Sequence, residues 1–261
     1  MYNFDFEKPS SVADAVTALG ADEAQALGGG QTLIPTLKQR LASPSKLVSL
    51  TGIADMKGVT ASGGTVKIGG ATTHATVAAE ATAYPALAAT ASHIGDPAVR
   101  NRGTIGGSLA NNDPSACYPA AALGSGATIT TNTRDIAADD YFQGMFTTAL
   151  EEGEIITSVT FPVPEKANYQ KFVQPASRFA LVGVFVAKYA DGVRVAVTGA
   201  SNDGVFRWTE AEAALSGNFS ASAVEGLAAP SGDMISDLHG TSEYRAHLVT
   251  VLTKRAVAAA A

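Results

Sequence analysis

Three consecutive glycines, Gly28, Gly29 and Gly30, are followed by Gln31 and Thr32 and stand between a predicted strand and a predicted helix. Glycine adopts backbone angles that other residues avoid, and its missing side chain lets backbone N–H groups approach a ligand closely. The N-terminus of the following helix adds partial positive charge. The pattern is typical of an anion site suited to a diphosphate, and a tight turn that requires glycine is the alternative.

A second glycine-rich segment covers residues 102–108, and Asn111 and Asp113 follow it closely. Thr104 and Ser108 contribute hydroxyl groups, while the residues after them contribute amides and a carboxylate. Such groups can surround the phosphates and ribityl hydroxyls of a flavin; a polar surface loop held by Asx turns is the alternative. Two glycine segments that each carry small polar side chains favour the nucleotide interpretation.

Several other kinds of site do not fit the sequence. A Rossmann fingerprint would need glycine where Leu33 stands, and the chain has no Gly-Lys-Ser/Thr of a P-loop. Cys117 is the single cysteine, so the chain cannot supply the roughly four thiolates that an iron–sulfur cluster needs. The four histidines lack ligand-like spacing, so we expect no metal site. Hydrolase motifs are lacking as well, and we predict no catalytic residue.

The overall composition indicates a folded protein with a real core. Of the 261 residues 46% are hydrophobic, and 18 Lys and Arg stand against 24 Asp and Glu, which gives a net charge of −6. Without a run of basic residues, we expect no nucleic-acid partner. No apolar stretch is long enough to span a bilayer and no secretory signal is visible, so we expect a cytoplasmic protein.

The elements that must position the glycine segments follow from periodicity and turn residues. The segment 95–119 is rich in Gly, Asn, Asp and Pro, so we expect it to be irregular and functional. A linker with two prolines covers residues 162–166, and a hairpin turn is expected at Asp191 and Gly192. We expect helices at 12–19, 33–41, 73–80, 86–94, 209–215, 221–229 and 243–258, and strands at 26–27, 47–50, 66–68, 127–130, 155–161, 180–188 and 193–199.

The glycine segments at residues 28–35 (GGGQTLIP) and 103–108 (GTIGGS), with residues 38–42 and 112–114, resemble the flavin loops of a known family. They are similar to the medium subunit of aerobic carbon monoxide dehydrogenases, and more widely to the FAD domain of the xanthine dehydrogenase family of molybdenum hydroxylases. Further matching motifs stand at residues 141–144, 153–156, 169–171 and 243–245. The resemblance therefore covers almost the whole chain.

The resemblance implies an α+β fold in two domains. Residues 1–165 would form a two-part FAD-binding domain of the vanillyl-alcohol-oxidase (PCMH) type. Residues 168–261 would form a small C-terminal domain of the carbon monoxide dehydrogenase flavoprotein type, with an antiparallel sheet and helices. We expect the boundary near residue 165.

The resemblance also implies which residues bind FAD. Ile156 would back the isoalloxazine and Lys171 would contact FAD. Phe179 stands where the relatives have a tyrosine beside the flavin ring, so it can stack but cannot hydrogen-bond. Cys117 stands where relatives often have an aspartate, part of whose role Asp113 could take. The full predicted set is Gly28, Gly29, Gly30, Gln31, Thr32, Leu33, Thr104, Ile105, Gly106, Gly107, Ser108, Asn111, Asp113, Cys117, Ile156, Lys171 and Phe179.

In the family, a large subunit holds molybdopterin and oxidises the substrate, and a small subunit relays electrons through two 2Fe–2S clusters. The resemblance implies that this chain receives those electrons on FAD and passes them to an external acceptor, within a dimer of heterotrimers. The substrate would be carbon monoxide, an aldehyde, a purine or an N-heterocycle, chosen by the large subunit. Two alternatives stay open: a free-standing FAD-dependent oxidase or dehydrogenase, and an assembly module that has lost FAD.

Three features outside the glycine segments receive structural interpretations. We expect Trp208 to be a packing anchor at the start of a helix and His93 to be a structural histidine. The acidic cluster of Glu151, Glu152 and Glu154 is interpreted as a solvated turn rather than a catalytic carboxylate pair.

Overall fold

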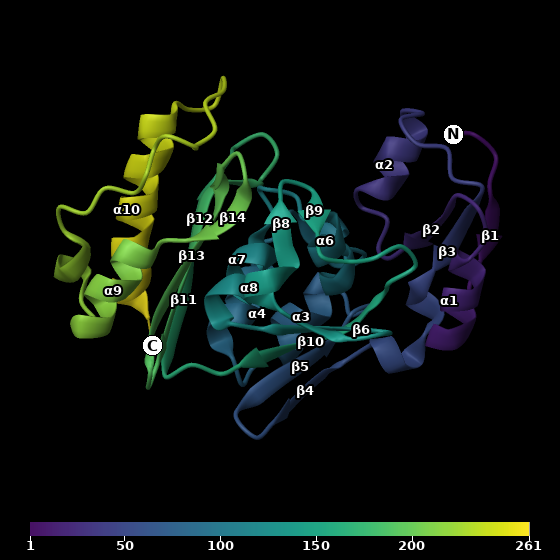
Figure 1. The fold of residues 1–261 in the computed structure, drawn as a ribbon, viewed down its shortest axis with the longest axis horizontal. Helices are drawn as coiled ribbons and strands as arrows, with labels where there is room; N and C mark the ends of the chain where they lie inside the picture. Colours follow the sequence, from purple (N-terminus) through teal and green to yellow (C-terminus); the bar gives the residue numbers. More distant parts are fainter. Residues whose placement is uncertain (261) are drawn as a thin grey trace.

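The computed structural model describes residues 1–260, in which helices and strands are mixed along the chain. Three larger sheets, besides one two-stranded hairpin, follow one another from the N-terminal end to the C-terminal end of the molecule (Figure 1). Within the described residues, no helix is long and apolar enough to cross a membrane.

The N-terminal sheet has the order β1–β3–β2, and all its strands are parallel. Its strands are β1 (Asp5–Glu7), β2 (Ala24–Leu27) and β3 (Lys46–Ser49), connected by the helices α1 (Val12–Leu19) and α2 (Leu33–Lys38). α1 begins as predicted at Val12, and Ser11 caps it, since the Ser11 hydroxyl accepts a hydrogen bond from the Asp14 N–H at 3.1 Å. The first glycine segment is thus the connection between β2 and α2, as the sequence predicted.

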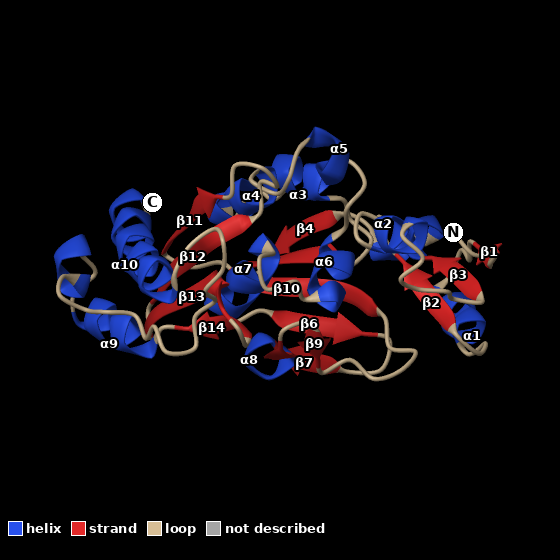
Figure 2. Cartoon of the chain, turned by 90° about the horizontal axis from the view of Figure 1, so that it is seen from above, coloured by secondary structure: helices blue, strands red, loops and turns tan. Residues whose placement is uncertain are grey.

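The central sheet is antiparallel, with the order β4–β5–β10–β6–β7. The middle strand, β10, is the last of the five in the sequence. Between β5 and β6 the chain forms a run of helices that lie over this sheet (Figure 2). The strands are β4 (Val59–Ser62), β5 (Thr65–Gly69), β6 (Thr128–Thr131), β7 (Asp135–Ala137) and β10 (Ile156–Pro162), and a small hairpin of β8 (Phe142–Gly144) and β9 (Thr147–Thr148) precedes β10. The helices are α3 (His74–Glu80), α4 (Pro85–Ser92), α5 (Pro97–Arg100), α6 (Ile105–Asn111), α7 (Cys117–Ser125) and α8 (Ala138–Tyr141).

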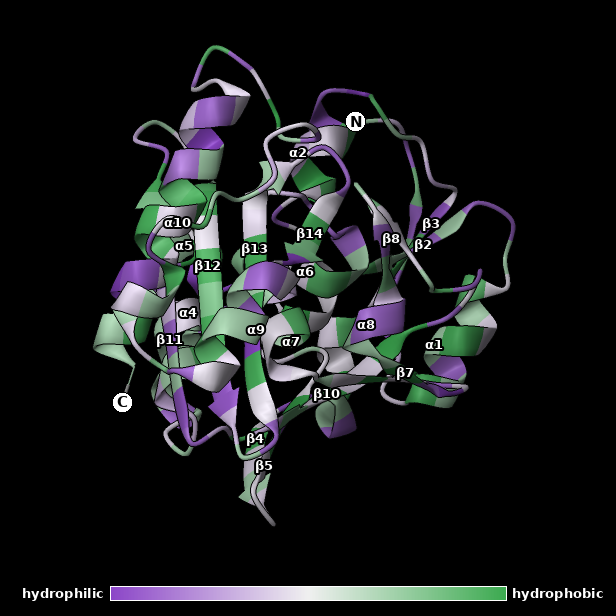
Figure 3. Cartoon of the chain, turned by 60° about the vertical axis from the view of Figure 1, so that its left-hand side comes forward, coloured by the Kyte–Doolittle hydropathy of each residue, from purple (hydrophilic) through white to green (hydrophobic). Residues whose placement is uncertain are grey.

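The C-terminal sheet is an antiparallel meander, β11–β12–β13–β14. It comprises β11 (Lys166–Val173), β12 (Ala180–Tyr189), β13 (Gly192–Ser201) and β14 (Gly204–Arg207), followed by α9 (Thr209–Gly217) and α10 (Ser242–Ala259). α9 and α10 cover one face and α7 covers the other, so the two central strands are almost wholly buried and apolar (Figure 3). Trp208 is 1% exposed in the core under α9 and α10, which confirms its packing role.

The core around α7 extends from the central sheet into the C-terminal sheet, since Phe185 and Ala196 belong to it. An ion pair crosses the same boundary: Arg194 on β13 binds the Asp139 carboxylate at 2.7 Å and also donates to the Leu123 carbonyl. The division of the chain into two domains near residue 165 therefore remains a prediction.

Three expectations about the elements are wrong, and several elements were not predicted. The helix expected at 33–41 ends at Lys38, because Arg40 takes a left-handed φ of 60° and leaves Leu41 73% exposed. The segment 95–119 is largely helical, because the Asp96 and Thr104 side chains cap α5 and α6. In place of a helix at 221–229 the chain forms one 3-10 turn, Ala221–Val224. The strands β1, β4, β7, β8, β9, β11 and β14 and the helices α7 and α8 were not predicted.

Candidate functional site

The two glycine segments meet at a cavity of about 660 Å³, which is also lined by residues from β10, α7 and β11. Every predicted site residue except Ile105 lines this cavity. Ile105 is fully buried in the core beneath α6 instead, so it supports the site from behind. The structure therefore brings together, from five parts of the chain, the residues that the sequence had selected.

The first glycine segment packs directly against the second. A Cβ on Gly29 would overlap the Arg102 carbonyl and lie 2.6 Å from the Gly103 Cα, and one on Gly28 would lie 2.8 Å from the Thr104 hydroxyl. Gly30 has a positive φ of 72°. Two of these glycines are thus required by close approach between the loops, and the third by its backbone angle.

The first segment also presents unpaired backbone donors. Among residues 1–260, the N–H groups of the five residues from Gly28 to Thr32 donate to no protein acceptor. These residues all line the cavity. A run of free N–H groups on one loop forms a concave site for an anion. Since α2 has six residues and α6 seven, the local N–H groups rather than long helix dipoles supply the positive charge.

The glycines of the second segment have different tasks. Gly106 rests on the central sheet: its N–H donates to the Gly70 carbonyl at 2.9 Å, and a Cβ there would lie 2.6 Å from the same oxygen. Gly107 lines the cavity, and a Cβ on it would contact Thr104 Oγ1 alone, at 3.0 Å. Thr104 Oγ1 in turn accepts from the Gly107 N–H at 3.2 Å. Gly107 thus exposes backbone to the cavity, whereas Gly106 positions the helix.

Lys171 and Cys117 form one wall of the cavity. The Lys171 ammonium donates to Cys117 Sγ at 3.4 Å and to the His93 carbonyl at 2.9 Å. Lys171 comes from β11, and Cys117 is the first residue of α7. His93 itself does not line the cavity, and its backbone carbonyl holds Lys171 from behind this wall. His93 therefore has the predicted structural role, because its backbone carbonyl anchors the Lys171 side chain.

Asp113 stands in the turn between α6 and α7. Its carboxylate accepts a hydrogen bond from the Ser115 N–H at 2.8 Å, and partial burial raises the pKa of the Asp113 carboxyl group. The turn is attached to β13, since the Gly199 N–H and the Thr198 hydroxyl both donate to the Pro114 carbonyl. The C-terminal sheet therefore positions Asp113 at the cavity.

Aromatic and aliphatic side chains complete the cavity. Phe179 lies in the loop between β11 and β12 and is 48% exposed, so its ring is free to stack on a ligand. Ile156, at the start of β10, is 4% exposed and lines the same cavity. These are the positions for which the resemblance implied contacts with a flavin ring.

The acidic cluster differs from the expected solvated turn at one residue. The Glu154 side chain is 2% exposed and lines the cavity. Its carboxylate accepts hydrogen bonds from Arg134 at 2.9 Å and from the Thr131 and Thr133 hydroxyls at 2.8 and 2.7 Å. The Arg134 hydrogen bond is the main cause that holds the pKa of Glu154 well below its usual range. The other carboxylate oxygen accepts from Arg134 Nη2 at 3.1 Å and from the Glu151 N–H at 2.7 Å. With five donors, Glu154 fixes the turn before Ile156 and has no lone pair to spare for proton transfer.

His74 is a cavity residue that sequence reasoning missed. Its imidazole is 4% exposed, and burial, with the nearby Arg100 charge, lowers its pKa to about 4. Its one sequence signal is its place directly after Thr73, which caps α3. That signal marks a helix start and says nothing of a ligand.

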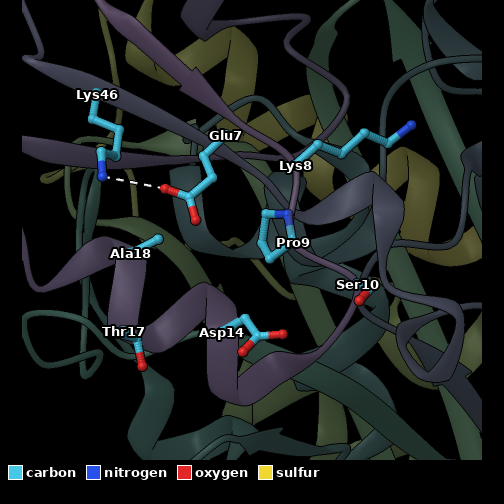
Figure 4. A pocket seen from close by; sticks show the side chains of 8 residues that line it. All are labelled: Glu7, Lys8, Pro9, Ser10, Asp14, Thr17, Ala18 and Lys46. Atoms are coloured by element: carbon cyan, nitrogen blue, oxygen red, sulfur yellow. Dashed lines mark hydrogen bonds and ion pairs between the residues drawn. The ribbon is translucent and has the colours of Figure 1, made fainter.

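A second hollow, of about 480 Å³, lies between β1 and α1 (Figure 4). Glu7 and Lys46 form an ion pair of 3.2 Å across it. Its lining, in the described part of the chain, contains neither glycine segment. The larger cavity is therefore the candidate site. No group of His, Cys, Asp and Glu side chains within residues 1–260 is suited to hold a metal ion.

Comparison with known proteins places this geometry in context. The family model described as the FAD binding domain in molybdopterin dehydrogenase matches residues 2–164. The carbon monoxide dehydrogenase medium chain of Afipia carboxidovorans is 35% identical, with 98% of this chain and 96% of the relative covered. The nicotine 6-hydroxylase medium subunit of Paenarthrobacter nicotinovorans is 36% identical, with 97% and 95% covered. A crystal structure of a Cu,Mo-CO dehydrogenase matches with a TM-score of 0.87 and 32% identity over 99% of this chain and 98% of that one.

Proposed function

Since this chain belongs to the family of FAD-binding domains of molybdopterin dehydrogenases, we propose that it is the FAD-carrying electron-transfer subunit of a molybdenum hydroxylase complex. It receives electrons from the 2Fe–2S clusters of a partner and passes them to an external acceptor. The relatives named medium chain or medium subunit match it from end to end, which supports the same place in a complex.

The observation that carries the proposal is the cavity between the two glycine segments. The free N–H groups between Gly28 and Thr32 suit the diphosphate of FAD, and the hydroxyls of Thr104 and Ser108 lie on the facing segment. Ile156, with Leu150 beside it, supplies an apolar backing for the isoalloxazine. FAD would then lie between the N-terminal and central sheets, the two parts of a PCMH-type domain, with the C-terminal domain beginning near residue 168.

The remaining predicted residues have defined tasks in this arrangement. Lys171 and Cys117 form the wall beside the flavin, and Phe179 stacks at its open side. Asn111 and Asp113 offer hydrogen bonds at the end of α6. Bound FAD supplies the one- and two-electron chemistry, and these residues bind it and set its surroundings.

The carboxylates of the cavity offer at most one candidate base to a free-standing oxidase. Among the described lining residues, the carboxylates are those of Glu154 and Asp113. Glu154 is held by Arg134 and two threonines, and Asp113 is bound to the Ser115 N–H. A substrate oxidised at this flavin would need a poised base, and Glu154 is not free to act as one. Asp113 is then the one carboxylate of this described lining that could serve, so it is the match to medium subunits over the whole chain that favours the electron carrier.

The partners follow from the same proposal. The single cysteine leaves the chain without ligands for an iron–sulfur cluster, so the clusters must lie on a small partner subunit. A large subunit holds molybdopterin and selects the substrate. The complex is a heterotrimer, paired into a dimer of trimers.

Tagged purification of this chain after co-expression with the genes of its partners tests the proposal. The complex should contain FAD, iron and molybdenum. Carbon monoxide, an aldehyde, a purine or nicotine should bleach the visible flavin absorption of the complex and leave the isolated, FAD-loaded chain oxidised. Flavin reduction in the isolated chain would identify a free-standing oxidase. Purification without flavin, and failure to take up added FAD, would identify an assembly module.

A further inference from the structure

His74 lies at the junction of the two glycine segments. Its backbone N–H donates to the Gly103 carbonyl at 2.9 Å, and its neighbour Thr73 forms an isolated β-bridge with Thr104. Gly103 in turn packs against Gly29 of the first segment. The backbone of His74 is therefore fixed where both segments come together.

The imidazole of His74 reaches the cavity beside Gly103. It packs on the Tyr118 ring, with ring centroids 5.3 Å apart, and is itself 4% exposed. A Cβ on Gly103 would lie 2.5 Å from His74 Nε2 and 2.8 Å from Cδ2. Since Gly103 and His74 both line the cavity, only glycine at position 103 leaves room beside this edge of the ring.

The two ring nitrogens of His74 have different surroundings. Nδ1 is buried and has no hydrogen-bond partner among the described residues. A pKa of about 4 makes the ring neutral near pH 7, so it carries one proton. A buried N–H without an acceptor is rarer than a buried acceptor without a donor. The proton therefore belongs on Nε2, at the edge that Gly103 leaves open.

We propose that His74 binds FAD, with its Nε2–H donating a hydrogen bond to an oxygen of the diphosphate. The inference rests on the proposed function and adds to it a ligand-binding residue outside both glycine segments. The diphosphate is the acceptor because Gly103 adjoins both Gly29 and the His74 ring, so the free N–H groups of residues 28–32 and the ring line the same cavity around one shared contact. Neighbouring backbone N–H groups and Nε2–H then act together as donors.

Three substitutions in the full-length chain test this role. His74→Gln places an amide donor close to the position of Nε2, and His74→Asn places one close to Nδ1 instead. His74→Phe keeps the ring that packs on Tyr118 and removes the donor. A hydrogen bond to a charged acceptor leads us to expect a roughly 10- to 100-fold weaker FAD affinity for Asn and Phe, and a change within about threefold for Gln.

Titration with FAD, ADP and riboflavin separates the parts of the ligand. ADP binding should weaken with FAD binding in the Asn and Phe variants, while riboflavin binding stays unchanged. Variants that fold normally and bind FAD and ADP as tightly as the unchanged chain would overturn the proposal. A loss confined to riboflavin would place His74 at the flavin ring and overturn it as well.

The tautomer gives a readout that does not depend on folding of a variant. Nitrogen-15 spectra of the histidine-labelled chain should show neutral His74 with its proton on Nε2, and the Nε2 signal should shift when ADP is added. A proton on Nδ1, or no shift at saturating ADP, would contradict the inference. If the unchanged chain binds neither FAD nor ADP, the proposed function fails. If the unchanged chain binds both, and neither the His74 substitutions nor ADP changes the measured affinity or the Nε2 signal, only the role of His74 fails.

Discussion

The ammonium group of Lys171 lies 3.4 Å from the sulfur of Cys117, so a cation and a thiol meet on the wall of the candidate FAD cavity. The same ammonium holds the backbone carbonyl of His93 at 2.9 Å. The contact joins β11 of the C-terminal sheet to the first residue of α7. The thiol occupies the position where the resemblance implied an aspartate.

Replacing that thiol by a carboxylate should change the flavin site. We expect Cys117→Asp to tighten FAD binding or shift the reduction potential, because the carboxylate can pair with Lys171 and accepts hydrogen bonds more strongly than a thiol. FAD titration and redox titration of the loaded chain measure both quantities. Cys117→Asn is the matched control without charge. Unchanged affinity and potential in the Asp variant would show that position 117 does not face the cofactor.

A side chain at Gly107 should block FAD without unfolding the protein. Its Cβ would point into the cavity and contact only Thr104 Oγ1, so we expect Gly107→Val to lower FAD affinity by at least about 10-fold. Gly217→Val, at a helical glycine with open space around it, is the control for helix propensity. Full flavin occupancy in the Gly107 variant at a dilute FAD concentration would refute the assignment of this loop.

A side chain at Gly29 should instead damage the fold. Its Cβ would overlap the Arg102 carbonyl, so the two loops must separate. We expect Gly29→Ala to lower the free energy of unfolding by about 1–3 kcal/mol and to weaken FAD binding at the same time. Chemical denaturation of the FAD-free chain measures the first effect, with Gly232→Ala at an open position as control. Unchanged stability would mean that the contact between the loops is looser than described.

The pairing of Glu154 with Arg134 should make stability depend on pH. Because the pKa of Glu154 is depressed in the folded chain, its stabilisation is present above the ordinary glutamate pKa and is lost as the pH falls towards the folded value. We expect Glu154→Gln to destabilise the chain by about 1–3 kcal/mol near pH 7, and by less near about pH 3.5. Urea denaturation at both pH values checks the difference, with the exposed Glu152→Gln as control. An equal loss at both pH values would refute the charge-based explanation.

The sequence predicted the glycine loops because their signal is local. Gly28, Gly29 and Gly30 stand together between a strand and a helix, and the chain folds there as expected. α6 was missed because Gly106 and Gly107 disfavour helix, yet the Thr104 cap and contacts with the central sheet outweigh that preference.

The rest of the site depends on contacts that local patterns do not encode. His74 meets Gly103 beside the Thr73–Thr104 bridge, whose residues are 31 positions apart in the sequence, and such a pairing leaves no helical or strand periodicity. Glu154 looks like a solvated acid in the sequence, and only the fold brings Arg134 and two threonines to its carboxylate. Ile156, Lys171 and Phe179, which line the same cavity, were predicted from the family resemblance and not from their spacing in the sequence.

β12 and β13 are buried on both faces, and one of these faces supports α7. The C-terminal third of the chain therefore helps to hold the candidate FAD site in place. The family match ends at residue 164, yet α7, which carries Cys117, is packed against Phe185 and Ala196. A polypeptide cut at that point would leave this apolar face in water and would lose Lys171 as well. Such a fragment should aggregate rather than fold, so we expect residues 1–164 and the C-terminal third to unfold together and not to be exchangeable separately between relatives.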